Sequence, residues 1–363
     1  MNKKRVYFFL GTIAEFIKLA PIIKELQERK IKFKIIISGQ SPVNFNELKD
    51  YLGPIKPDIL LKEKFKKSSI ILFFIWSIGA LIEGIFSLRK EFKKLNKTNS
   101  YFIVHGDTVS STIGSLIAKF YNLKLVHIES GLRSYNFLEP FPEEICRYIN
   151  MSLADILFCP NEWALNNTKN FKGEKVNTKE NTLIEPFWWA MNQTKKLNYK
   201  RKFGKYYILY IRRQEHLYFR KNYIGKIITT VFNTANKNLN CLFSLNPLNA
   251  FLFGILNSKK KKDYHLIPIE RLPYADFMQL LNQAEFIATD GCTNQEEAYY
   301  MGLPLLALRN RTERIEGLKK NVIISKGNKN IIGNFLTKYK KYRNKTIMIK
   351  EKPSKIIVDY LFK

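Results

Sequence analysis

Apolar runs alternate with helical patterns along the first half of the chain. An apolar run at 5–10 ends in a Gly turn, and residues 14–30 then carry apolar side chains at helical spacing. The same order repeats, with strands predicted at 33–41, 101–108, 123–131 and 155–160 and helices at 110–122 and 142–153. Strands that alternate with helices predict an α/β protein whose parallel sheet is covered on both faces.

A polar, turn-rich segment at 166–181 interrupts this pattern, and we interpret it as a crossing between domains. A second alternation begins at residue 206 and ends in basic helices. The length of 363 residues also suits two domains. We therefore predict two doubly wound, Rossmann-like domains at 1–170 and 195–345, facing a central cleft. The amphipathic tail at 350–363 is expected to pack on the first domain.

Ligands of such sheets bind at the carboxyl ends of the strands. Gly11, Gln40, Asp107 and Glu129 all follow predicted strands of the first domain, and so mark its candidate site. There is no P-loop and no GxGxxG motif.

The chain has 61 Lys and Arg against 31 Asp and Glu, a formal net charge of +30. We expect no nucleic-acid partner, because no recognition module and no basic stripe with interleaved aromatic residues is present. Attraction to an anionic membrane surface and a plain compositional bias towards Lys, Asn and Ile both remain open.

The run at 70–86 is apolar but carries Glu83 and is shorter than the roughly 20 residues of a membrane span. It is therefore expected to form a buried or partly interfacial helix. The chain opens without a signal peptide, and its four cysteines are widely spaced without a CxxC pair. These features predict a cytoplasmic protein, with contact at the inner membrane face left open.

Four stretches taken together resemble one known family. "GTIAEFIKLAPIIKEL", "GDTVSS", "HIESGLRS…PFPEEICR" and "TD…QEEAYYMGLPLLALRNRTERIEG" are similar in order and spacing to the UDP-N-acetylglucosamine 2-epimerase family, which has the GT-B fold. The resemblance runs from about residue 5 to about residue 320. It implies a UDP-sugar substrate and no metal or cofactor, and it leaves a homodimer open.

The chemistry of this family explains why a basic chain gathers carboxylates at strand ends. The hydrogen on C2 of the sugar is not acidified by a carbonyl, so the anomeric C–O bond to UDP breaks first. The cationic centre that results acidifies C2, elimination gives a glycal, and UDP returns with a proton on the other face. This requires an acid and a base on opposed faces, together with negative charge beside the cation.

By resemblance, the catalytic groups are Asp107, Glu129 and Glu143, with Arg147 on the same helical face as Glu143. Glu144 points about 100° away from Glu143 and is expected to tolerate Gln. The resemblance also implies a set of substrate- and nucleotide-binding residues: Lys18, Gln40, Arg212, Arg213, Gly291, Cys292, Thr293, Glu297 and Arg309. Of these, Lys18 is implied to face a phosphate and Glu297 the ribose hydroxyls.

The sequence departs from the family pattern at the nucleotide and anomeric end. Ile13 and Ala14 replace an Arg-Pro pair, Arg212 stands where the family has His, and Gly291–Thr293 replaces Ser-Gly-Gly. His216 lies nearby without replacing the family His. Arg212 or Arg213 is still expected to grip the pyrophosphate.

These departures leave three functions open. The intact carboxylates favour an epimerase that supplies donors for surface polysaccharide. The departures and the charge favour a GT-B glycosyltransferase that docks near a membrane-bound acceptor in capsule or lipopolysaccharide assembly. A binding remnant without activity is the third alternative.

Overall fold

The computed structural model describes residues 4–61, 70–93, 95, 100–193, 197–212, 221–245, 254 and 258–363. Contacts divide the chain into two compact units, one formed by Met1–Pro186 with Lys350–Lys363 and the other by Phe187–Ile349. The first unit therefore extends beyond the expected limit of residue 170.

The first unit is built on a parallel sheet in the order β3-β2-β1-β4-β5-β6-β7. Its strands are β1 (Arg5–Leu10), β2 (Phe33–Ile37), β3 (Ile59–Leu60), β4 (Ser100–His105), β5 (Lys124–Ile128), β6 (Ile156–Cys159) and β7 (Glu174–Asn177). The chain moves outward from β1 in one direction and from β4 in the other, so these two neighbours form the topological switch point.

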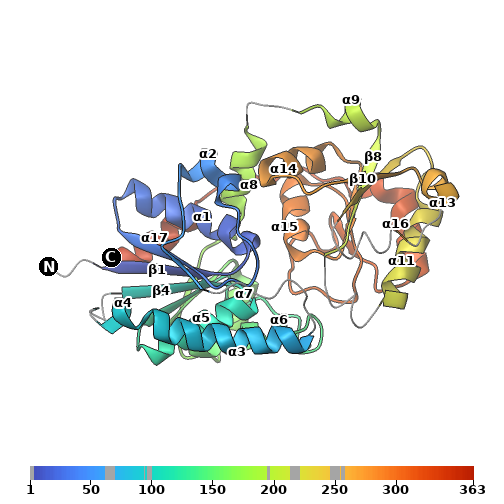
Figure 1. Ribbon diagram of the computed structural model, residues 1–363. Helices are drawn as coiled ribbons and strands as arrows, with labels where there is room; N and C mark the ends of the chain where they lie inside the picture. The colour runs from blue at the N-terminus through green and yellow to red at the C-terminus, as the bar shows by residue number, and fades with distance from the viewer. Residues whose placement is uncertain are drawn as a thin grey trace. The chain divides into compact units, whose positions relative to one another are not determined.

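The helices of this unit lie on both faces of the sheet, as the alternating pattern predicted. In Figure 1, α1 and α17 lie on one side, and α3, α5 and α6 on the other. The helical elements are α1 (Ile13–Glu28), η1 (Phe45–Leu48), α2 (Lys49–Leu52), α3 (Ile70–Ser87), α4 (Arg89–Lys93), α5 (Val109–Phe120), α6 (Glu143–Leu153), α7 (Glu162–Asn167) and α17 (Pro353–Phe362), and α8 (Ile184–Met191) spans the division between the units.

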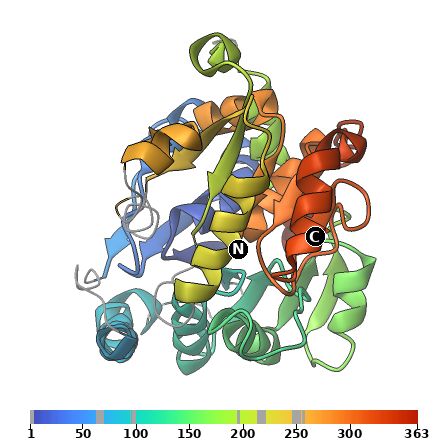
Figure 2. The same cartoon turned by 90° about the vertical axis from the view of Figure 1, so that its right-hand side faces the viewer.

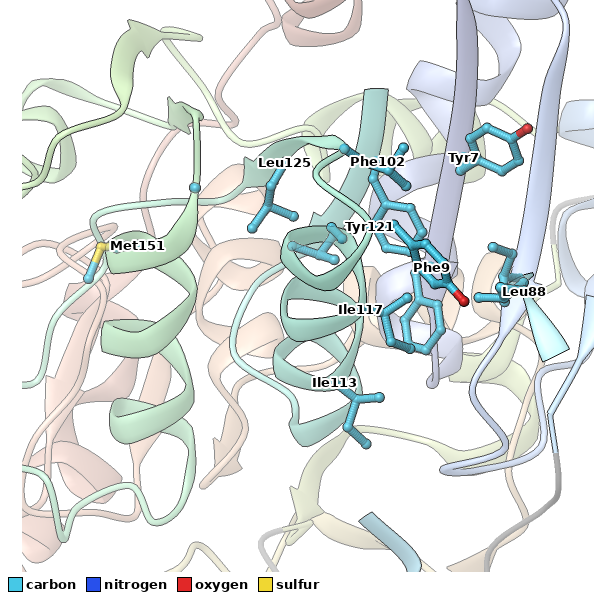
Figure 3. Packing of buried hydrophobic residues seen from close by; sticks show 14 of the residues in the cluster. Tyr7, Phe9, Leu88, Phe102, Ile113, Ile117, Tyr121, Leu125 and Met151 are labelled. Atoms are coloured by element: carbon cyan, nitrogen blue, oxygen red, sulfur yellow. The ribbon is translucent and has the colours of Figure 1, made fainter. Parts of the chain in front are cut away.

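Alternate side chains of each strand pack against opposite helix layers. Phe9 of β1 and Phe102 of β4 lie against α5, where Ile113 and Ile117 meet them (Figure 3). These four side chains are nearly or fully buried. Burial of each stabilises the fold by about 1.5–3 kcal/mol relative to exposure.

The segment at 166–181 is not the crossing that the sequence suggested. It contains β7, which pairs with β6 at the edge of the sheet, and the division between the units falls later, inside α8. Only Val176 of β7 is aliphatic, so the strand has no apolar pattern to reveal it.

The C-terminal helix α17 belongs to the first unit and packs on α1. Arg29 pairs with Asp359 at 2.6 Å, and the Lys4 ammonium donates to the carbonyl of Leu361 at 2.8 Å. Helices α1 and α17, far apart in the sequence, thus pack together in the first unit.

The second unit has a parallel sheet in the order β10-β9-β8-β11-β12-β13, with its switch point between β8 and β11. Its strands are β8 (Tyr206–Tyr210), β9 (Asn240–Ser244), β10 (Leu266–Ile269), β11 (Ile287–Thr289), β12 (Leu305–Ala307) and β13 (Val322–Ile324). Its helices are α9 (Tyr199–Phe203), α11 (Lys221–Thr234), α13 (Ser258–Asp263), α14 (Tyr274–Gln283), α15 (Cys292–Met301), α16 (Lys329–Lys338) and η3 (Tyr339–Tyr342). Helices α11 and α16 pack side by side (Figure 2, yellow and orange-red).

The apolar run at 70–86 forms most of α3. Trp76 and Ala80 are buried against the sheet side, but the opposite face of the helix is exposed. Among the described residues, no helix combines the length and apolarity that crossing a membrane requires.

Candidate active site

The switch point of the first sheet is held together by a buried carboxylate. Glu15 lies in the first turn of α1 and accepts hydrogen bonds from the Gly11 amide (2.9 Å), the Thr12 hydroxyl (2.9 Å) and the Thr108 hydroxyl (2.8 Å). It thereby ties the turn after β1 to the turn after β4, next to Asp107. Burial raises the pKa of Glu15 to about 7, against the opposing effect of these donors.

Gln40 connects the chain after β2 to the start of α5 at the same edge of the sheet. It follows β2, and its Oε1 accepts from the Ser110 amide at 2.8 Å in the first turn of α5. The expectation placed Gln40 along the binding site, and the structure places it half-buried at the same carboxyl edge as Gly11.

Glu129 directly follows β5 and is buried, with a backbone φ of +66°. A positive φ is costly for a residue other than Gly, and such positions gather at functional sites. Its carboxylate receives the Lys18 ammonium at 2.6 Å and the Asn181 amide, and His105 Nε2 lies 3.8 Å away. Lys18, expected to face a phosphate, is therefore buried in an ion pair with Glu129.

Asp107 and Arg147 form the second charged pair of this edge. Arg147 projects from α6 with its guanidinium buried, and Nη2 donates to Asp107 Oδ2. Glu143 begins α6, one turn before Arg147. The thiol of Cys146 lies near both carboxylates: burial first, then the charges of Asp107 and Glu143, raise its pKa to about 12.

His127 of β5 links its strand to the turn after β4. Its Nε2 donates to the Gly106 carbonyl at 2.7 Å, and the Ser130 hydroxyl lies 2.6 Å from Nδ1. Burial lowers the pKa of His127 to about 4, with Arg147 lowering it and Glu129 raising it. The imidazole is therefore neutral at physiological pH. The four expected catalytic side chains thus come from one edge of one unit.

Glu144, expected to tolerate Gln because it points away from Glu143, lies in the protein interior. It is fully buried and accepts from Arg133 Nε at 2.5 Å, the Ser134 amide at 3.0 Å and Arg147 Nη1 at 2.7 Å. The 100° offset from Glu143 was right, but the side to which Glu144 turns is the interior. These contacts argue against the expected tolerance of Gln at this position.

In the second unit, two loops at the switch point are joined by Asp290. Its Oδ1 accepts from the Arg212 amide at 2.8 Å, which ties the chain after β8 to the chain after β11. The Thr289 hydroxyl donates to the Tyr210 carbonyl and accepts from the Gly291 amide. Arg213 and His216 lie outside the described residues.

Helix α15 begins at this point, after Gly291. Gly291 offers no side-chain cap, and Gly291, Cys292 and Thr293 are only half-buried. The first turn of a helix carries free amides and partial positive charge, which suits a phosphate. Glu297 lies one turn later and is buried, accepting from Asn294 at 2.8 Å.

Arg309, expected to contact nucleotide, is buried within the unit. Its Nη1 lies 3.1 Å from Glu313 Oε2 and 3.2 Å from the Cys292 sulfur, and Nη2 lies 3.4 Å from Gln295. These contacts place Arg309 behind the first turn of α15, where it holds that turn in place.

Sequence reasoning did not find the partners of the expected residues. They are Glu15, Arg133, Asn181, Asp290 and Glu313. Of these residues, only Glu15 could have been found from the sequence, because Thr12 and Glu15 have capping-box spacing. Within the described residues, no group of three or more His, Cys, Asp or Glu side chains could hold a metal ion.

Comparison with known proteins agrees with the motifs. A UDP-N-acetylglucosamine 2-epimerase of Methanococcus maripaludis is 30% identical over 346 residues, covering 89% of this chain and 88% of that protein. The enzyme of the same name from Neisseria meningitidis is 30% identical over 388 residues and 99% of each chain.

A solved structure of Methanocaldococcus jannaschii UDP-GlcNAc 2-epimerase, in complex with UDP-GlcNAc and UDP, has a TM-score of 0.83 at 25% identity. The match covers 98% of this chain and 99% of that one, so the two parallel-sheet units have the GT-B fold of such epimerases. The model of the family described as UDP-N-acetylglucosamine 2-epimerase matches residues 24–356. Chain-wide agreement of motifs, sequence and fold leads to one assignment: this chain belongs to the UDP-N-acetylglucosamine 2-epimerase family.

Proposed function

We propose that this chain is a sugar-nucleotide 2-epimerase, an isomerase that inverts C2 of a UDP-N-acetylhexosamine by eliminating and re-adding UDP. The observation that carries the proposal is the gathering of Asp107, Glu129, Glu143 and Arg147 at one sheet edge. The names of the related enzymes, and the UDP-GlcNAc bound to the M. jannaschii one, support this substrate class.

The contacts of the three carboxylates suggest different roles. Glu129 is buried between Lys18 and Asn181, so it suits a fixed negative charge beside the cationic sugar. The side chain of Asp107 is a quarter exposed and Glu143 is half-buried, so both are accessible to substrate. We assign the acid and the base that exchange the C2 proton to Asp107 and Glu143.

The second unit is proposed to hold UDP. The amides at Gly291–Thr293 would receive phosphate oxygens, the Arg212 side chain would add a cation, and Glu297 would accept from the ribose hydroxyls. Loss of one such charge-assisted contact should weaken UDP binding about ten- to hundredfold.

The test follows deuterium at C2. The protein is incubated with UDP-N-acetylglucosamine in heavy water, and incorporation at C2 is followed by NMR. Asp107→Asn and Glu143→Gln should each slow exchange about a hundredfold or more, while calorimetry shows UDP affinity unchanged. Asp155→Asn is the matched control, because Asp155 also pairs with a cation, Lys119, but lies at the start of β6, at the opposite edge of the sheet. Wild-type protein that binds UDP yet exchanges no C2 hydrogen would overturn the proposal.

We also propose that the exposed face of α3 binds a second copy of this chain. Phe74, Ile75, Ile78, Ile82 and Phe86 recur at helical spacing, and each is roughly half to two-thirds exposed. Leu116 and Phe120 of the neighbouring α5 are exposed as well. With about 100 Å² from each side chain, the patch amounts to about 700 Å². That exceeds the largest patch of a typical monomer and approaches the area of about 800 Å² that each partner of a stable interface buries.

The composition of this helix favours a protein partner over a membrane surface. Helix α3 contains no Lys or Arg and carries Glu83, whereas helices that bind anionic membranes have a basic polar face.

The wild type should sediment as a dimer and Ile78→Glu as a monomer. Leu138→Glu, which changes an exposed apolar residue elsewhere, should remain dimeric. A monomeric wild type would contradict the proposal, and flotation with anionic vesicles would point to the membrane.

A further inference from the structure

Glu144 is fully buried and contacts Arg147 of the proposed site, but the proposed catalysis does not use Glu144 itself. Its three donors come from Arg133 and Ser134 in the loop after β5 and from Arg147 in α6. Burial alone would raise the pKa of Glu144, but the Ser134 amide and the two guanidinium groups outweigh it and hold the pKa below its usual range. Glu144 is thus a permanent anion in the interior.

The two ends of the Arg147 guanidinium have different partners. Nη1 donates to Glu144 at 2.7 Å, and Nη2 donates to Asp107. Because a guanidinium is a rigid planar fork, fixing Nη1 also fixes the direction of Nη2. The position of Glu144 therefore determines where the cation beside Asp107 lies.

Arg133 supports Glu144 from the other side. Its guanidinium carbon lies 5.4 Å from the ring centroid of Tyr135 and 5.6 Å from that of Tyr148. These rings hold Arg133 at one end of the network, while Asp107 lies at the other end. The order of contacts is Arg133, Glu144, Arg147, Asp107.

We propose that Glu144 is a positioning residue of the reaction, which acts on Asp107 through Arg147 and does not itself touch the substrate. The inference rests on the proposed epimerase function. The proposed role differs from that of a purely structural carboxylate such as Glu185. Glu185 accepts hydrogen bonds from the amide and the hydroxyl of Ser354, both at 2.8 Å, and anchors α17.

The experiment is a double-mutant cycle on C2 exchange. Displacing a catalytic group by about 1 Å costs about a hundredfold in rate, so Glu144→Gln should lower kcat by about ten- to hundredfold with KM nearly constant. If Glu144 acts through Asp107, adding Glu144→Gln to Asp107→Asn should change kcat by less than about twofold. Glu144→Asp keeps the charge and should recover part of the loss. Glu185→Gln is the control and should keep full kcat.

If the losses in kcat caused by Glu144→Gln and Asp107→Asn multiply in the double variant, the two residues act independently and the inference is overturned. If Glu144→Gln does not fold, Arg133→Gln tests the same chain of contacts from the end opposite Asp107 and should lower kcat, not raise KM. A crystal structure of the variant gives a readout independent of activity: the Arg147–Asp107 contact should be lost, and its retention would refute the inference. Absence of C2 exchange in the wild type would instead refute the proposed function and leave this structural result standing.

Discussion

Replacing Glu15 by Gln should change how stability depends on pH. The carboxyl of Glu15 is buried and its pKa is raised from 4.5 to about 7. Between these two values the folded protein holds a proton that the unfolded chain has released, so the wild type loses stability as pH rises through this window. At about 1.4 kcal/mol per pKa unit, the loss amounts to about 3 kcal/mol.

Gln does not titrate, yet it can keep the contacts. Its carbonyl can accept from the Gly11 amide and the Thr12 hydroxyl, and its amide can donate to the Thr108 hydroxyl. Relative to the wild type, Glu15→Gln should therefore gain about 2–3 kcal/mol in free energy of unfolding between pH 5 and pH 8. His127, whose lowered pKa makes stability rise with pH between about 4 and 6.5, is present in both proteins and cancels in the difference.

Urea unfolding at pH 5, 6, 7 and 8 measures this difference directly. Glu28→Gln, exposed on the same helix, is the control and should follow the wild-type curve. A difference between Glu15→Gln and the wild type that stays constant across the four pH values would show that Glu15 is ionised throughout, and the reasoning from burial would fail.

Three further outcomes are expected. Lys18→Met should destabilise the fold by about 3–5 kcal/mol in urea unfolding, because it leaves Glu129 as an uncompensated buried charge; adding Glu129→Gln should restore part of the loss. Gly114→Ala should cost about 1–3 kcal/mol despite the better helix propensity of Ala, because the new Cβ would lie 2.7 Å from the ring of Phe9. Of the four cysteines, Cys292 alone is not buried, so N-ethylmaleimide should label the folded protein there first, as mass spectrometry of the peptides would show.

The sequence predicted the central strands and helices, which follow a regular alternating pattern. Apolar runs such as those ending at Leu10 and His105 located the central strands, and parallel topology then placed Asp107 and Glu129 at one edge. Strands β3 and β7 were missed because an edge strand of two or four residues carries too few apolar side chains to form a pattern.

The pairing of charges was beyond the reach of the sequence. Lys18 and Glu129 are 111 positions apart, and their contact depends on how α1 lies against the end of β5. Helical geometry separated Glu143 from Glu144 by angle, but it does not say which side of a helix meets the protein interior. That side is set by tertiary packing, here by the loop that carries Arg133 and Ser134.

The return of α17 to the first unit has a consequence for biosynthesis. A ribosome makes α1 before the whole second unit and α17 after it. Domains usually fold as they emerge, the N-terminal one first. Here the second unit can be completed while α1 still lacks the helix that packs on it, so the apolar surface of α1 stays uncovered until α17 emerges.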